Sequence, residues 1–325
     1  MGVDYYDRSE ETRRHMLGAR LDGNTHSRLG VDHFEVEYEF GGAACASATS
    51  FDAATKWPQC ANTINYIKDQ AACGSCWAVA ASSTIADREC ITCGAGLNSS
   101  SNHQGPGEGA PGIDISAEQI MSCCSTCGDG CQGGYPLDAM AYYCNTGVVT
   151  GGWFKSGCGC QSYEVDPTSR TEGPTPACKS TCDDPNYPDS FANDKHMGSR
   201  YYAVKGEANM KSEICTNGPI ECGFTVKQSF ETFFREHPTG IYCGGGWFDR
   251  TLGGHAITVR GWGVGADSKG SQQNYWLINN SWNTTWGDSG KFRYCRGKDL
   301  DGMEASCAAA TPKCNNKNGK ANKLM

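Results

Sequence analysis

Residues 69–90 read "DQAACGSCWAVAASSTIADREC", and the cysteine pair in "CGSCW" at 73–77 decides how the rest of the chain is interpreted. Two cysteines three positions apart can belong to a zinc site, a redox pair or a disulfide framework, or one can be cross-linked while the other is a nucleophile. The alanine-rich stretch that follows predicts a helix with Ser75 as its N-cap. Cys76 would then begin the helix, where the positive end of the helix dipole favours a thiolate.

The residues around this cysteine pair do not match the pattern of a metal site or a redox site. The other cysteine clusters, "CITC" at 90–93 and "CCSTCGDGC" at 123–131, have no nearby histidine or matching pair that would complete four zinc ligands. A thioredoxin-like pair is expected after a strand in a βαβ pattern, which this region lacks. We therefore expect neither a metal ion nor a cofactor.

Composition narrows the class of protein further. The chain has 325 residues, enough for one two-lobed domain or two domains, and a net charge of −8 without a long basic run, which argues against nucleic acid as a partner. No run of 18 apolar residues predicts a membrane span. The 21 cysteines favour a lysosomal or other acidic vesicle, or secretion. The polar start lacks the apolar core of a signal peptide, so we expect that one was removed.

Composition and hydrophobic pattern divide the chain into a leader and a mature domain. Residues 1–48 are charged and predict a separable leader, whereas residues 49–325 predict the mature domain. Helical patterns lie mainly within 60–160, including "SAEQIMSCC" at 116–124. Short strands bounded by glycines lie mainly within 200–300, for example "GGHAITVRGWG", "NYWLINNSW" and "GKFRYCRG". These patterns predict an α+β fold.

A nucleophilic cysteine needs a histidine that accepts its proton and a third group that orients the histidine. Of the seven histidines, three lie in the leader and three in polar surroundings. His255 alone is framed by glycines and precedes an apolar strand. The alternative interpretation of His255 is a buried core histidine bonded to a carbonyl group.

Four motifs follow one another along the chain: "QAACGSCW", "CQGGYP", "GGHAITVRGWG" and "NNSWNTTWGDSG". Together they resemble the papain-like cysteine proteases, and the long interval between the first and third resembles the cathepsin B branch, which carries an insertion there. The similarity runs from about residue 51 to residue 312, and residues 13–34 weakly resemble the end of the propeptide. The resemblance implies a helical lobe and a barrel-like strand-rich lobe with the active-site cleft between them.

The resemblance also implies roles for particular residues. Cys76 is the nucleophile, His255 the base and then the acid, and Asn280 orients His255. Gln70 joins the Cys76 N–H in an oxyanion hole, and Trp282 shields the bond between Asn280 and His255 from water. The substrate-binding positions carried over are Gly133, Gly134, Pro136, Gly223, Ala256, Trp282 and Ser306.

Ser306 stands at the far end of the pocket for the side chain two residues before the scissile bond, where cathepsin B has a glutamate. Leu, Val or Phe is therefore expected there in preference to Arg. The disulfides implied by the resemblance are Cys60–Cys90, Cys73–Cys131, Cys123–Cys178, Cys124–Cys127 and Cys158–Cys182, with Cys160 competing for the last position. The other cysteines cannot be paired from the sequence.

The resulting expectation is an acid-active cysteine endopeptidase, working through a thiolate–imidazolium pair and an acyl-enzyme, whose leader inhibits it until acid releases the leader. Dipeptidyl carboxypeptidase activity should be weak, because the segment from Cys158 to Cys182 is short and contains no histidine. Expected partners are peptide and protein substrates and cystatin-like inhibitors of a monomeric enzyme. Asn98 is the favoured glycan site, and the lysine-rich end is expected to be a frayed tail. The alternatives are a catalytically idle peptide-binding relative and a disulfide-rich structural protein.

Overall fold

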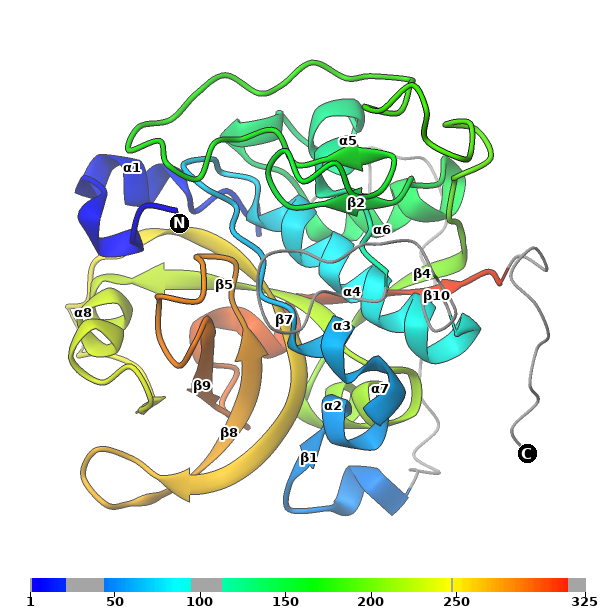
Figure 1. The fold of residues 1–325 in the computed structure, drawn as a ribbon. Helices are drawn as coiled ribbons and strands as arrows, with labels where there is room; N and C mark the ends of the chain where they lie inside the picture. The colour runs from blue at the N-terminus through cyan, green and yellow to red at the C-terminus, as the bar shows by residue number, and fades with distance from the viewer. Residues whose placement is uncertain (1, 22–43, 95–112, 247, 315–325) are drawn as a thin grey trace.

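The computed structural model describes residues 2–21, 44–94, 113–246 and 248–314 (Figure 1). The expected glycan site Asn98 and the lysine-rich end after residue 314 lie outside these ranges. The helices are α1 (Glu10–His15), α2 (Ala53–Lys56), α3 (Ala61–Asn65), α4 (Cys76–Cys93), α5 (Ala117–Cys123), α6 (Pro136–Asn145), α7 (Glu207–Asn217) and α8 (Gln228–Glu236). In the described part of the chain, no helix is both long and apolar enough to cross a membrane.

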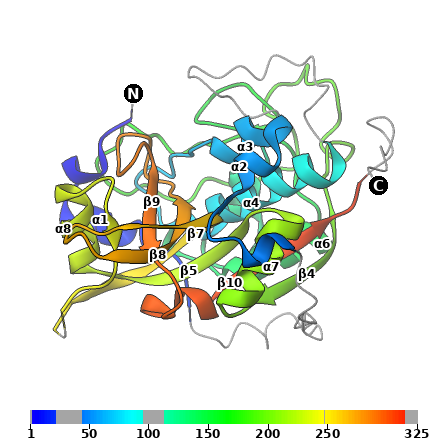
Figure 2. The same ribbon diagram turned by 90° about the horizontal axis from the view of Figure 1, so that it is seen from below.

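The strands form one large sheet and a separate pair. The large sheet has the order β4-β10-β5-β7-β8-β9-β6, with β1 paired to β7, and its pairs are antiparallel apart from β6 with β9. Figures 1 and 2 show how β7 and β8 curve around the core beneath them. The strands are β1 (Phe51–Asp52), β2 (Gly151–Gly152), β3 (Gln161–Ser162), β4 (Gly198–Val204), β5 (Ile220–Lys227), β6 (Ile241–Tyr242), β7 (Thr251–Ala266), β8 (Gln272–Asn279), β9 (Lys291–Cys295) and β10 (Cys307–Pro312).

Helix α4 is the central helix of the molecule, and nearly every residue from Cys76 to Cys90 is buried. Its small side chains allow neighbours to approach from all sides, as expected of a helix inside a core. Ser75 is the N-cap by position, but its hydroxyl group bonds to the Tyr163 hydroxyl group at 2.7 Å and caps no helical N–H. By contrast, Ser116 caps α5 by accepting a hydrogen bond from the Gln119 N–H.

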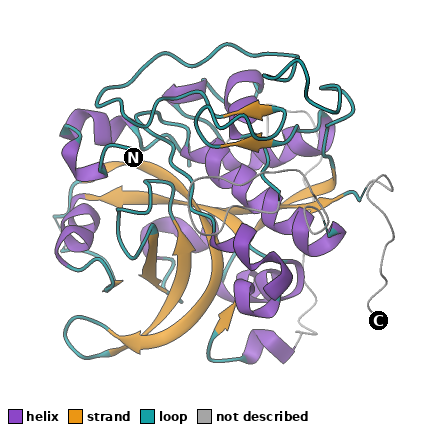
Figure 3. Ribbon diagram, in the orientation of Figure 1, coloured by secondary structure: helices purple, strands orange, loops and turns teal. Residues whose placement is uncertain are grey.

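Two hydrophobic cores lie side by side. The helical core gathers small and aliphatic residues around α4, and the strand-rich core is dominated by aromatic rings. Figure 3 shows the long curved strands on one side of the molecule and helices α4, α5 and α6 on the other, while α7 and α8 contribute to the strand-rich core. The division is not strictly sequential, because the last strand, β10, places Ala308 and Ala310 in the helical core.

The leader lies across the junction of the two cores. Residues 18 and 19 form isolated parallel bridges with Gly254 of the sheet and Gly134 of the helical lobe. A third small cluster at the junction contains Ala19 and Leu21 of the leader together with Cys76 and Ala256. Leader and junction are therefore packed as one structure.

Nine disulfides join described residues. Four of them are pairs that the resemblance implies: Cys60–Cys90, Cys73–Cys131, Cys123–Cys178 and Cys124–Cys127. The expected partner of Cys182 was wrong: Cys160 forms that bond, and Cys158 is a free thiol. The Asp183 N–H donates to the Cys160 carbonyl oxygen at 2.8 Å, and this backbone bond places Cys160 next to Cys182.

The remaining disulfides are Cys45–Cys215, Cys93–Cys314, Cys222–Cys307 and Cys243–Cys295. The first of them joins the short 3-10 helix Ala44–Ser47 to α7. Close by, the Trp262 indole donates a hydrogen bond of 3.0 Å to the Ala48 carbonyl oxygen. Residues 44–48 are therefore fixed to the strand-rich lobe.

Candidate active site

Cys76 is the first residue of α4 and is fully buried. Its side chain packs against Ala256 of β7, whose N–H group points at the sulfur together with the Gly18 N–H of the leader. The sulfur therefore lies where a strand of one lobe, a helix of the other and the leader meet. Cys73, three residues earlier, forms a disulfide with Cys131. One cysteine of the pair is therefore structural, and the other, Cys76, is a free thiol.

His255 approaches from the sheet. Its Nε2 lies 2.7 Å from Asn280 Oδ1. Because an amide oxygen can only accept, the proton sits on Nε2, and Nδ1 remains an acceptor; no described group bonds to it. The Trp282 indole stacks on the imidazole with ring centroids 4.4 Å apart and is itself fully buried. Water is thereby kept away from the bond between His255 and Asn280.

Burial sets the protonation states of the pair. It raises the pKa of the Cys76 thiol to about 11, against the opposing effect of the N–H groups of Ala256, Gly18 and Trp77. Burial likewise lowers the pKa of His255 to about 4, although its bond to Asn280 works the other way. The helix start alone suggested a depressed thiol pKa, but with the leader in place both groups are neutral near pH 7.

Gln70 holds the leader next to Cys76. Its side-chain N–H group donates to the Met16 carbonyl oxygen at 2.9 Å and to the Cys73 carbonyl oxygen at 2.8 Å. Its own side-chain oxygen accepts from the Ser281 hydroxyl group at 2.6 Å, which fixes the amide orientation. A donor aimed at a carbonyl oxygen beside a thiol is what an oxyanion hole requires.

Backbone pairing carries the leader past the sulfur. The Gly134 N–H donates to the Gly18 carbonyl oxygen, and the Gly134 carbonyl oxygen accepts from the Arg20 N–H, both at 2.9 Å. At Gly18 a Cβ atom would lie 1.8 Å from the Gly74 carbonyl oxygen, so only glycine fits there. A Cβ atom on Gly133 (φ +104°), next to Gly134, would lie 2.6 Å from the Gly18 carbonyl oxygen.

The Leu21 side chain occupies the pocket expected from the sequence. A Cβ atom built on Gly223 would lie 2.4 Å from a methyl group of Leu21, and Ala256 packs in the same cluster. Ser306 stands next to Gly223, whose N–H donates to its carbonyl oxygen at 2.8 Å. Pro136 begins α6 and is buried.

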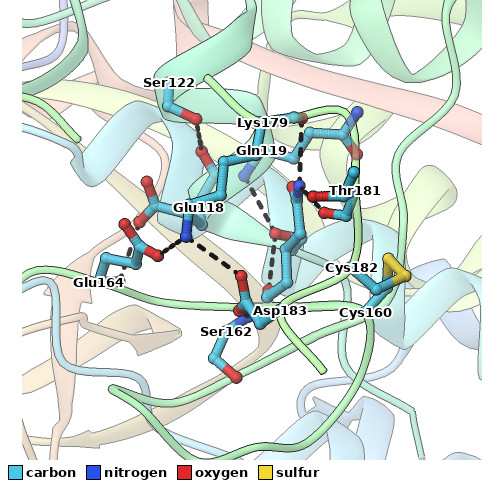
Figure 4. A network of polar contacts seen from close by, with 12 residues as sticks. Glu118, Gln119, Ser122, Cys160, Ser162, Glu164, Lys179, Thr181, Cys182 and Asp183 are labelled. Atoms are coloured by element: carbon cyan, nitrogen blue, oxygen red, sulfur yellow. Dashed lines mark hydrogen bonds and ion pairs between the residues drawn. A yellow bond between two sulfur atoms is a disulfide. The ribbon is translucent and has the colours of Figure 1, made fainter. Parts of the chain in front are cut away.

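The loop from Cys158 to Cys182 also holds the leader. Arg170 donates to the Asp7 carbonyl oxygen at 2.9 Å and accepts at its own carbonyl from Thr12, and Glu172 contacts His15 at 2.6 Å. Lys179, the other cation of this loop, contacts Glu164 and Asp183 (Figure 4). Arg170 is thus the loop cation closest to the leader's path.

Sequence reasoning missed Glu221, which lies on β5 two residues before Gly223. Its carboxyl group is completely buried, and neither oxygen has a hydrogen-bond partner among the described residues. Burial raises the pKa of Glu221 far above its usual range, so the group is neutral and supplies no anion to the pocket. Nothing in the sequence marks it, because its burial depends on strand pairing.

The comparisons with known proteins identify the family of the chain. The family model described as papain family cysteine protease matches residues 47–312. A cathepsin B-like cysteine proteinase 4 of Caenorhabditis elegans is 39% identical over 277 residues, which cover 81% of this chain and 75% of the relative. A gut-specific cysteine proteinase of the same organism is 39% identical over 272 residues, or 81% and 73% of the two chains.

Among solved structures, the proCathepsin B S9 of Trypanosoma congolense matches with a TM-score of 0.73 and 30% identity, over 97% of this chain and 94% of that chain. The digestive procathepsin L 3 of Tenebrio molitor shares the fold with a TM-score of 0.59 at 18% identity, over 95% and 81%. A helix-borne cysteine beside a sheet-borne histidine, between two lobes, defines a cysteine protease. The chain belongs to the papain family, and its relatives are of the cathepsin B-like type.

Proposed function

We propose that Cys76 and His255 form the catalytic pair of this protease. The observation that carries the proposal is the meeting at one point of a helix-terminal thiol, an imidazole held by Asn280, and a Gln70 N–H already bound to a peptide carbonyl oxygen. Peptide and protein substrates would follow the path that the leader takes. The density of disulfides supports action in an oxidising setting, on the secretory route or beyond it.

In the reaction, the Cys76 thiolate attacks the scissile carbonyl carbon, and the carbonyl oxygen becomes an oxyanion held by Gln70 and the Cys76 N–H. The His255 imidazolium gives its Nδ1 proton to the leaving amine, which leaves a thioester on Cys76. Water then transfers a proton to His255 and attacks the thioester carbon; the carbon–sulfur bond breaks, the acid product leaves, and the Cys76 thiolate and His255 imidazolium are restored. Asn280 keeps the other ring proton on Nε2 throughout.

The leader accounts for the inactive state. It occupies Gln70 with its own carbonyl group and packs against Cys76, and in this arrangement burial keeps both members of the pair neutral. It passes the sulfur as a parallel partner of Gly254 on one side and Gly134 on the other. We infer that residues 1–48 contain the inhibitory segment and that the enzyme is made as a zymogen.

Acid weakens only some of the leader's charged contacts. The hydrogen bond from Arg250 lowers the pKa of Glu10, so this contact stabilises the docked leader above the usual carboxyl pKa and is lost only as the pH falls below that value. Release by acid should therefore begin below about pH 4.3, the usual carboxyl pKa.

The test is covalent labelling of Cys76 by an epoxide inhibitor, in the full chain and after the leader has been cut at a protease recognition sequence inserted between residues 22 and 43. Burial raises the pKa of the Cys76 thiol and the leader packs against it, so the uncut chain should label much more slowly than the cut one. Gly18→Val should speed labelling of the uncut chain, because its side chain would collide with Gly74. Equal rates in cut and uncut wild-type protein would contradict autoinhibition, and no labelling in either would favour the catalytically idle relative.

We further propose that the enzyme cleaves mainly within chains. The loop from Cys158 to Cys182 supplies Arg170 but no histidine, and Lys179 is held by two carboxylates. Arginine stays charged at all relevant pH values, so it would not provide an acid-dependent grip on a terminal carboxylate. A quenched peptide and its C-terminal amide should be cleaved at similar rates; strong preference for the free acid, with dipeptides as the main product, would contradict this.

A further inference from the structure

Glu231 of α8 is a carboxylate of the mature domain whose partners in the described structure come from the leader. The Tyr5 hydroxyl group donates to Oε1 at 2.6 Å, and Arg13 Nε lies 3.5 Å from Oε2. Glu231 is only 1% exposed in this arrangement. Departure of the leader would therefore leave a carboxylate without its donors in a pocket that the leader had filled.

The same leader residue lies on an aromatic platform beside the catalytic pair. The Tyr5 ring stacks on the Trp282 indole with centroids 4.1 Å apart and an interplanar angle of 12°. That indole also stacks on His255. Phe230, the neighbour of Glu231 in α8, contacts Trp282 edge to face. A planar side chain is thus held flat by Trp282 while its tip reaches Glu231.

The position of this pocket relative to the scissile bond follows from the leader. Leu21 lies in the pocket expected for a residue before the bond. Met16 and Tyr5 lie on the other side of Gly18, next to Gln70 and Trp282. Substrate residues that follow the scissile bond would therefore run toward Trp282 and Glu231.

We propose that in the leader-free enzyme Trp282 and Glu231 form a binding site for a tyrosine side chain in the part of the substrate after the scissile bond. The ring would stack on Trp282, and the hydroxyl group would donate to the Glu231 carboxylate, as Tyr5 does in the leader. A buried acceptor discriminates against phenylalanine, which would leave it without a donor. Glu231 is a specificity-determining residue in this inference, which rests on the proposed function.

The experiment uses the full chain cut at the inserted recognition sequence, with quenched peptides in which Tyr or Phe is placed in turn at each of the first four positions after the bond. At one position Tyr should be preferred over Phe by about 10-fold in kcat/KM, through KM, since a hydrogen bond to a charged group is involved. Glu231→Leu should abolish that preference, and Glu231→Gln should retain part of it because the amide oxygen still accepts. Glu236→Leu, at the exposed end of the same helix, should leave it intact.

Two further measurements separate this inference from the proposed function. A substrate that ends in a fluorophore directly after the bond has no residue for this site, so all four proteins should cleave it at the same rate; failure of the wild type to cleave it would count against the proposed function. Tyr- and Phe-containing product peptides should also differ about 10-fold in affinity for the cut Cys76→Ala protein, which needs no catalysis. If Glu231→Leu weakens binding of a leader peptide but leaves the Tyr to Phe ratio unchanged, Glu231 serves the leader alone and the inference is overturned.

Discussion

The helical and strand-rich lobes are stabilised by different means. Around α4 the helical core consists largely of small and aliphatic side chains, and five disulfides lie within residues 60–182. The strand-rich core contains a continuous group of stacked and edge-on rings from Phe224, Phe230, Trp286 and Tyr294. Aromatic side chains bury about 150–250 Å² each, whereas alanine-rich packing buries far less per residue and benefits more from cross-links.

The comparison shows that the catalytic geometry depends on the contact between the two lobes. Cys76 belongs to the lobe with the small-residue core, and His255 and Asn280 belong to the aromatic one. Their alignment depends on how α4 packs against the sheet, not on either core alone. Each of the following predictions tests one part of this difference between the lobes.

The largest effect should follow from removing either member of the pair. Cys76→Ala and His255→Ala should each lower kcat/KM by at least about 10⁴-fold, and the double variant should be no worse than the single ones, because the two residues act as a unit. Peptide hydrolysis by the cut protein measures this, with the disulfide map as the check on folding. Losses that multiply would show that each lobe contributes independently.

The next effect concerns the contact between the lobes. Arg88 of α4 is buried, pairs with Glu213 of α7 at 2.6 Å, and donates to the carbonyl oxygens of Pro219 and Ala310. Arg88→Met leaves Glu213 buried without its cation and should lower the free energy of unfolding by about 3–5 kcal/mol. Denaturant unfolding of the full chain measures the loss, and Arg88→Met with Glu213→Leu should recover part of it. If the single variant is as stable as the wild type, the lobes are held together by other contacts.

A smaller effect is expected in the pocket that Leu21 fills. Ser306→Glu would add a carboxylate at the end of this pocket, and Glu221, on the same strand as Gly223, is buried and neutral. A charge-assisted hydrogen bond of about 1.5–3 kcal/mol should then shift the preference from Leu toward Arg by about 10- to 100-fold. Paired Leu and Arg substrates report the ratio. A wild-type enzyme that already prefers Arg would refute the assignment of this pocket.

The smallest effect should come from Cys158. Cys158→Ala removes a free thiol and should change the unfolding free energy by less than about 0.5 kcal/mol, while Cys160→Ala removes a cross-link and should cost roughly 2–4 kcal/mol. Thermal denaturation and non-reduced peptide mapping measure both. A Cys158–Cys182 peptide in the wild-type map would reverse this result.

Local features of the sequence predicted much of this structure. The helix after Ser75 and the strand around His255 were predicted because composition and glycine placement act over a few residues. The raised pKa of Cys76 was not, because it comes from complete burial at a point where residues distant in the chain, Ala19 and Ala256 among them, pack together. The same limit applies to Glu221 and Glu231, whose surroundings are made by strand pairing and leader docking.

The choice between Cys158 and Cys160 was also beyond the sequence. Both lie at the same end of one loop, and a backbone hydrogen bond between Asp183 and Cys160 places Cys160 next to Cys182. Spacing along the chain carries no such information about direction. The long-range pair Cys45–Cys215, 170 residues apart, could not be predicted for the same reason.

Because of this long-range disulfide, a cut in the backbone does not necessarily separate the two pieces of the chain. If the backbone is cut on the C-terminal side of Cys45, as a boundary at residue 48 would require, the severed leader stays joined to α7 through sulfur and keeps a high effective concentration beside the catalytic pair. A cut on the N-terminal side of Cys45 instead yields a free leader and a mature chain whose new first residues are anchored. Release of the leader therefore depends on the position of the peptide cut relative to the disulfide. Electrophoresis with and without a reductant would give different masses only if the cut lies on the C-terminal side of Cys45.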